Sequence, residues 1–156
     1  MTPRIGAPGE VADFHDSSLI DVIVSPTLEE ISVITSTPDE FGEEHLWRIS
    51  FYGVMRVEFE TVGDGVSTTE TPLEISDIYV DVESAESGRW AKRAEELGIA
   101  DGFRHVVLAS SFARGWGARE DLEGISIVCR GWEIDSAPNG YRGKKFGRPR
   151  IEGTHE

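Results

Sequence analysis

His15 and Asp16 are the first side chains in this sequence whose types could do chemistry together. A histidine beside an aspartate can bind a metal ion or act as an acid–base pair. Adjacent residues of a strand point to opposite faces, so both side chains could reach one ion only from a loop. In the structural alternative, which the sequence favours, Asp16 or Ser17 bonds backbone N–H groups where a strand begins, and His15 is hydrogen-bonded nearby.

Other residue types that occur in catalytic sites do not form a recognisable pattern here. His45, His105 and His155 lack metal-ligand spacing, and the apolar surroundings of His105 in sequence predict a hydrogen-bonded core or edge histidine. Ser110-Ser111 lacks the G-x-S-x-G setting of a hydrolase nucleophile, and no Gly-rich phosphate motif follows a strand pattern. We therefore expect no catalytic residue, no metal site and no cofactor, and the sequence leans against an enzyme without deciding the matter.

Arg114, Trp116 and Arg119 form the stronger candidate site, which would be a binding site. Trp116 stands between two glycines with no apolar neighbours to bury it. Trp and Arg lead the residue types found at binding hot spots. Trp132, in an Arg-Gly-Trp sequence, repeats the motif on the next predicted strand. The alternative, which is somewhat favoured, has Trp116 folding back to close the end of a β-sandwich.

The elements that must position these residues are organised around residues 46–60. Apolar and polar residues alternate there with a period of two, which is typical of a β-strand with one buried face. The alternation continues in phase across Gly53. An interior glycine usually marks a bulge or a bend, so we expect a single strand that bends at Gly53.

The chain around this strand predicts four strands, one helix and two strands. The expected ranges are 19–24, 31–35, 46–60, 73–83, a helix near 85–97, 103–112 and 122–134. This order favours an α+β fold with a mainly antiparallel sheet, curled into a sandwich or open barrel. It lacks the strand–helix alternation of a parallel nucleotide-binding sheet. The predicted core comprises Trp47, Ile49, Phe51, Val57, Phe59, Val80, Trp90, Leu108 and Ile127.

Three local signals refine these elements. The apolar phase slips by one residue in the fourth strand, which predicts a bulge near Ser76 and Asp77. Ser84 or Ser87 is expected to cap the start of the helix. Gly98 stands where a glycine usually ends a helix.

The charge pattern predicts one domain with distinct ends. Residues 1–12 are expected to be a flexible arm, 13–134 a single β-rich domain and 135–156 a basic C-terminal tail. The net charge is −14, and residues 1–88 carry nineteen Asp and Glu against three Arg. Such an acidic body repels nucleic acid and anionic membranes, so we expect a protein partner, in particular a basic one. We also expect the tail to pack on acidic surface, either on its own body or across a homodimer.

Cysteine usage and hydropathy indicate where the protein resides. Cys129 is the single cysteine, so no internal disulfide can form, and its apolar surroundings predict a small buried side chain. No apolar run approaches the length of a membrane span, and the N-terminus has no apolar signal segment. We therefore expect a cytoplasmic protein.

Three short motifs resemble a group of small, β-rich bacterial families. They are Phe14-His15-Asp16-Ser17 at the start of the first strand, Phe51-Tyr52-Gly53-Val54 in the centre and His105-Val106-Val107-Leu108 in a late strand. Several of these families are placed as immunity proteins of polymorphic toxin systems. The resemblance spans roughly residues 13 to 134 and implies a single-domain binder without catalysis. An acidic neutraliser would also steer a basic toxin towards itself.

Three function classes follow from the sequence. A binding module of the immunity type is favoured, with a hydrolase or metal-dependent enzyme using His15 and Asp16 as the first alternative. A homo-oligomeric structural protein is the second alternative.

Overall fold

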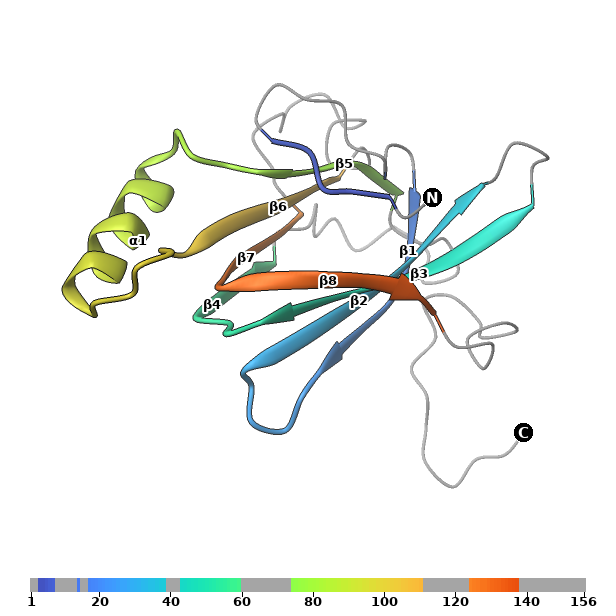
Figure 1. The fold of residues 1–156 in the computed structure, drawn as a ribbon. Coiled ribbons are helices and arrows are strands. Elements are labelled where there is room, and N and C mark those ends of the chain that lie inside the picture. The colour runs from blue at the N-terminus through green and yellow to red at the C-terminus, as the bar shows by residue number, and fades with distance from the viewer. Residues whose placement is uncertain are drawn as a thin grey trace.

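The computed structural model shows a mainly antiparallel β fold with one helix, which confirms the α+β class (Figure 1). It describes residues 3–7, 14, 17–38, 43–59, 74–110 and 124–137. Eight strands and one helix lie in these ranges. In chain order they are β1 (Ser17–Val24), β2 (Glu30–Pro38), β3 (Glu44–Tyr52), β4 (Arg56–Phe59), β5 (Glu74–Val80), α1 (Ala85–Glu96), β6 (Arg104–Ser110), β7 (Ile125–Cys129) and β8 (Gly131–Ser136).

The strands form one hydrogen-bonded sheet in the order β4-β7-β6-β5-β1-β2-β3-β8, and every neighbouring pair is antiparallel. We call β1-β2-β3-β8 the first half of the sheet and β4-β7-β6-β5 the second half. The seam between the halves is a short ladder from β1 to β5, in which Ser17 pairs with Ile75. The predicted bulge in β5 is confirmed, because the pairing of β5 with β6 shifts between Ile75 and Asp77.

The expectation of a single strand over residues 46–60 is wrong. The chain does bend at Gly53, which has φ +61°, but β3 ends at Tyr52 and β4 begins at Arg56. β3 pairs with β2 and β8, whereas β4 pairs with β7 at the other end of the strand order. The physical reason is that the bend turns the chain out of one half of the sheet and into the other.

The predicted strand over 122–134 divides at the same corner. β7 ends at Cys129 and β8 begins at Gly131, and Figure 1 shows the two strands (orange) meeting at a sharp turn. The element order is therefore five strands, one helix and three strands, instead of the expected four, one and two. Both errors have one cause, because the alternation of apolar residues continues across a corner that the backbone turns.

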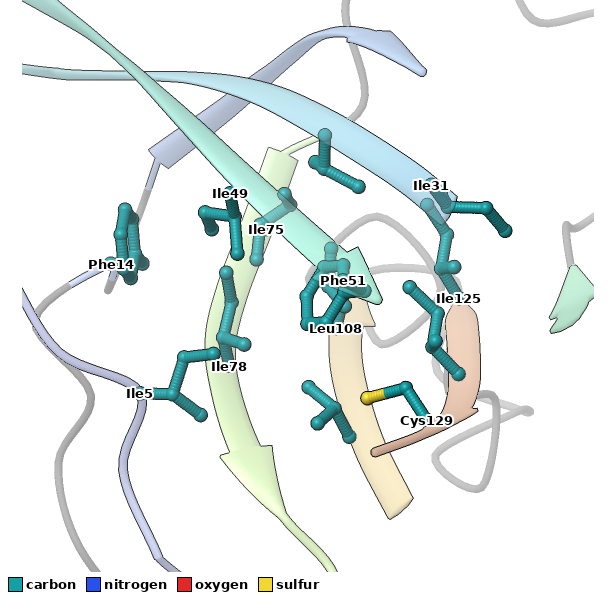
Figure 2. Packing of buried hydrophobic residues seen from close by; sticks show 13 residues of the cluster. Ile5, Phe14, Ile31, Ile49, Phe51, Ile75, Ile78, Leu108, Ile125 and Cys129 are labelled. Carbon is teal, nitrogen blue, oxygen red and sulfur yellow. The ribbon is translucent and has the colours of Figure 1, made fainter. Parts of the chain in front are cut away.

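The main core lies between the two halves of the sheet. Side chains of β2 and β3 point towards those of β5, β6 and β7 in Figure 2. Of the predicted core, four residues are buried and three more pack partly buried against them. The buried four are Ile49, Phe51, Leu108 and Ile127, and the other three are Trp47, Val57 and Val80.

Two members of the predicted core differ from the expectation. Phe59 is 58% exposed, because it lies at the last position of the short edge strand β4. Trp90 is half-buried on α1, where its ring meets Phe103 edge-on with 5.6 Å between ring centroids. The prediction of the core is thus wrong for Phe59. Trp90 is half-buried but does not belong to the main core, to which the prediction assigned it.

The predicted helix ends are confirmed. Ser84 is the N-cap, and its Oγ accepts a hydrogen bond from the Ser87 backbone N–H. Gly98 follows the helix with φ +71°, a conformation that glycine adopts without strain. Helix α1 lies at the opposite side of the molecule from the end of β2 and the start of β3 in Figure 1.

Residues 3–7, which lie in the expected N-terminal arm, pair with β5. Gly6 forms a parallel bridge with β5, donating its N–H to Ile78 O at 3.0 Å and accepting from Val80 N–H at 2.8 Å. Ile5 beside it is part of the core. These residues are held because they combine backbone pairing with apolar burial.

Phe51→Ala tests the register of β3. Removing this fully buried ring should lower the free energy of unfolding by about 3–5 kcal/mol, because a cavity is left between the halves of the sheet. Phe59→Ala is the matched control and should cost less than about 1 kcal/mol, since that ring is largely exposed. Urea unfolding measures both. Equal losses in the two variants would contradict the register.

Candidate functional site

Most of the side chains singled out from the sequence lie outside the described residues. This applies to His15 and Asp16 and to the loop residues Arg114, Trp116 and Arg119. Trp132 is described, on β8, where it is half-buried and packs against the core. Its ring centroid lies 6.5 Å from that of Phe51.

His105 is the centre of a buried polar cluster whose other members the sequence analysis did not predict. The ring is 3% exposed and joins β6 to both β7 and α1. Its Nε2 lies 2.6 Å from Ser126 Oγ, and its Nδ1 lies 2.9 Å from Ser87 Oγ and 3.4 Å from Asp81 Oδ2. The prediction of a hydrogen-bonded core histidine is confirmed.

The hydrogen-bond partners of Ser87 assign the tautomer of His105. Ser87 Oγ donates its hydrogen to the Asp81 backbone carbonyl at 2.7 Å. Because that hydroxyl has no second hydrogen, His105 must donate at Nδ1. In that tautomer, Nε2 accepts from the hydroxyl of Ser126.

A serine hydroxyl that donates to Nε2 of a histidine, with a carboxylate near Nδ1, is the arrangement that activates serine nucleophiles. Here the geometry serves a structural role. Ser126 is 6% exposed and lies on β7, so a reactant cannot approach its Oγ. The cluster instead fastens the N-terminal turn of α1 to the outer face of the second half.

Asp81 is held as a carboxylate by its surroundings. Burial raises the pKa of its carboxyl, but hydrogen bonds from Ser84 and from the backbone N–H groups of Glu83 and Ser84, together with His105, outweigh burial and lower that pKa below its ordinary value. The carboxylate thus caps the turn before α1.

The other titratable groups of the interior offer no chemistry. Burial raises the pKa of the Cys129 thiol to about 12, so the side chain stays protonated and inert, as the sequence predicts. Within the described ranges, no three His, Cys, Asp or Glu side chains come together as metal ligands. No helix in this part of the chain is long and apolar enough to cross a membrane.

Charge is distributed unequally between the two halves of the sheet. The second half with the N-terminal segment (residues 3–7, 53–59, 74–110 and 124–130) carries nine carboxylates and seven Lys or Arg. The described residues of the first half (17–38, 43–52 and 131–137) carry seven carboxylates and one Arg, Arg48. The seven are Asp21, Glu29, Glu30, Glu43, Glu44, Glu133 and Asp135.

Arg48 does not neutralise this surface. Its side chain is half-buried and donates from Nε to Ser32 Oγ at 3.1 Å. Ser32 in turn contacts Ser50 Oγ at 3.2 Å. Although Arg48 pairs in register with Asp135, the described residues show no ion pair for Asp135 or its neighbour Glu133. The first half therefore presents an acidic surface.

β8 forms one edge of the sheet, at the border of this acidic surface. It pairs with β3 on one side, and the ladder continues to a bond from Ala137 N–H to Leu46 O of 2.9 Å. Antiparallel ladders alternate between residues that bond to the neighbouring strand and residues that point away from it. The backbone N–H and C=O of Trp132, Ile134 and Ser136 therefore point away from β3, and no described residue pairs with them.

The opposite edge, β4, differs in length and charge. It spans four residues, against six in β8. Arg56 on β4 pairs with Glu58 at 3.2 Å and with Glu86 of α1 at 3.6 Å. A short edge that bears paired charges is a poor template for another strand, so β8 is the more open of the two edges formed by the described strands.

Comparison with known proteins adds a distant likeness. No family model and no curated protein match the chain. A crystal structure of an uncharacterized protein from Neisseria gonorrhoeae matches with 14% sequence identity and a TM-score of 0.46, covering 80% of this chain and 94% of that chain. Its name gives no activity, ligand or partner, so the function must be argued from the geometry above.

Asp81→Asn tests the charged cap at the polar cluster. Because the folded pKa of Asp81 lies below its ordinary value of 3.8, the carboxylate stabilises the fold above that pH, and the stabilisation is lost as the pH falls through the folded pKa. The variant should lose about 1–2 kcal/mol near neutral pH, and its difference from the natural protein should vanish in acid. Urea unfolding across the acid range measures this, with exposed Glu83→Gln as control. A difference that persists unchanged in strong acid would contradict the assignment.

Proposed function

We propose that this chain is a binding module that neutralises a basic protein partner, in the manner of an immunity protein. The single observation that carries the proposal is the acidic first half of the sheet, where seven carboxylates accompany one half-buried arginine. Surfaces of one sign accelerate the encounter with a partner of the opposite sign and disfavour partners of the same sign.

The interior supports binding over catalysis. The histidine and serine whose arrangement could activate a nucleophile are closed to reactants. The resemblance of three short motifs to families that include immunity proteins agrees with this proposal. A cytoplasmic location would suit this proposal, because a buried thiol such as that of Cys129 would remain reduced there.

A sheet curled into a sandwich or open barrel would provide the scaffold for this function. The paired corners at Gly53 and Arg130 and the seam between β1 and β5 support such a shape. A sheet bent in this way would place the exposed carboxylates on its outside and the main apolar core inside, so the partner would meet a rigid surface.

The test uses the product of the gene directly upstream of this one, the position in which a cognate toxin is expected. Co-expression should relieve the growth defect that this product causes, and the purified proteins should form a complex. The triple variant Glu29→Gln, Glu30→Gln, Glu44→Gln should slow association roughly tenfold at low salt, because it removes charge from the acidic surface.

The control variant removes three charges from the second half, with Glu83→Gln, Glu95→Gln and Glu96→Gln. It should leave the association rate nearly unchanged, since these exposed residues lie outside the acidic surface. If both variants slow association equally, net charge rather than the first half is responsible. Absence of both protection and complex would contradict the immunity-type function.

A further inference from the structure

We propose that the free edge of β8 binds an extended basic segment of the partner as an added antiparallel strand. This inference rests on the proposed function and names the surface and the chemistry by which the partner is recognised. Strand addition draws its affinity from main-chain hydrogen bonds and its specificity from the side chains at alternate positions. β8 offers both.

The backbone of β8 supplies the hydrogen bonds. Trp132, Ile134 and Ser136 each direct one N–H and one C=O away from β3, on the side where the sheet order ends. Open edges of this kind are templates for pairing with another chain. An added strand can satisfy these groups without any change in the pairing of β8 with β3.

The edge is held in place before the partner arrives. Trp132 and Ile134 pack against the core, so β8 cannot swing away from the sheet without exposing apolar surface. At its far end, Ser136 Oγ lies 3.3 Å from His45 Nε2 of β3. A strand that is already ordered loses little conformational freedom on binding, which favours association.

The charges of β8 specify a basic segment. Glu133 and Asp135 are exposed on the outer face of the sheet and have no ion-pair partner among the described residues. Being two residues apart, they lie on the same face, about 7 Å from each other along the strand. Lys or Arg at alternate positions of an added strand would lie across from both carboxylates.

The same charges oppose a second copy of this chain. An edge-to-edge pair of two β8 strands would bring Glu133 and Asp135 of one copy beside those of the other, and like charges on adjacent strands are destabilising. Acidic residues on an exposed edge thus discourage self-association while they permit a basic strand. We therefore assign the edge to a partner's segment.

The experiment uses the full chain and a synthetic peptide, acetyl-Thr-Lys-Val-Lys-Val-Lys-Thr-amide. Two control peptides carry Glu in place of Lys, or N-methyl groups on the amides that would face β8. In an NMR titration the lysine peptide should shift the amide signals of residues 131–136 and slow the hydrogen exchange of Trp132 and Ile134. Neither control peptide should bind.

Two pairs of variants separate charge from backbone. Glu133→Gln with Asp135→Asn should weaken the peptide about tenfold, whereas Glu95→Gln with Glu96→Gln should leave binding unchanged. Ile134→Pro should abolish binding because it removes an outward N–H, while Ile134→Ala, which loses the same apolar contact, should retain it. Thermal unfolding of both Ile134 variants checks that they are folded.

Several results would overturn strand addition while leaving the proposed function standing. Equal binding of the N-methylated peptide, or of Ile134→Pro, means contact through charge alone. Slow exchange of the Ile134 amide in the free monomer means that the chain's own residues cover the edge. If the free protein is a dimer and Ile134→Pro dissociates it, a second copy of the chain covers the edge of β8. If the peptide does not bind although the upstream gene product does, the partner contacts this chain at a surface other than β8.

Discussion

The corner at Gly53 is the constraint on which the rest of the structure depends. Between Tyr52, which pairs with Gly131, and Arg56, which pairs with Val128, one chain advances four residues while the other advances three. A Cβ atom on Gly53 would lie 2.6 Å from Cγ of Arg130, and the backbone there has φ +61°. Glycine fits because it meets both requirements at once.

The halves of the sheet acquire different outer faces from this arrangement. The His105 cluster lies on the outer side of the second half, where Val107 and Val128 are also buried although they point away from the main core. The outer face of the first half carries Arg48 and exposed carboxylates, while Ser32, Ile34 and Ser36 on the same face are buried. Both arginines of α1 pair with acids of the same helix, Arg89 with Glu86 and Arg93 with Glu96 at 3.6 Å.

Sequence patterns predicted what depends on neighbours along the chain. The alternation through Ile49 and Phe51, the bulge after Ile75 and the glycine after the helix all appear in the structure, because each is a local property of the backbone. Partners distant in sequence were not predictable. Ser87 and Ser126 lie 18 and 21 residues from His105, and no spacing rule connects them.

The order of the strands in the sheet could not be predicted from the sequence either. The edge position of β8, which the proposed binding site depends on, was therefore not predictable. The sequence predicts Trp132 as a binding residue because it lies beside arginine and glycine. In the structure its ring packs inward, and the groups that it directs outward are its backbone N–H and C=O. Whether a strand lies at an edge depends on which other strands pair with it. The exposure of Phe59 and the edge position of β8 were both missed for this reason, because the corner at Gly53 sets the neighbours of both strands.

A recognition surface made from backbone groups leaves little trace in a sequence. Any residues that pack inward at alternate positions would hold β8, and any carboxylates between them would give it the same charge. Catalysis, in contrast, requires particular side chains in an accessible site, and the described chain buries its one arrangement of that kind beneath α1. The specificity of the proposed strand-pairing binder would instead reside in the edge of β8 and in its charge pattern.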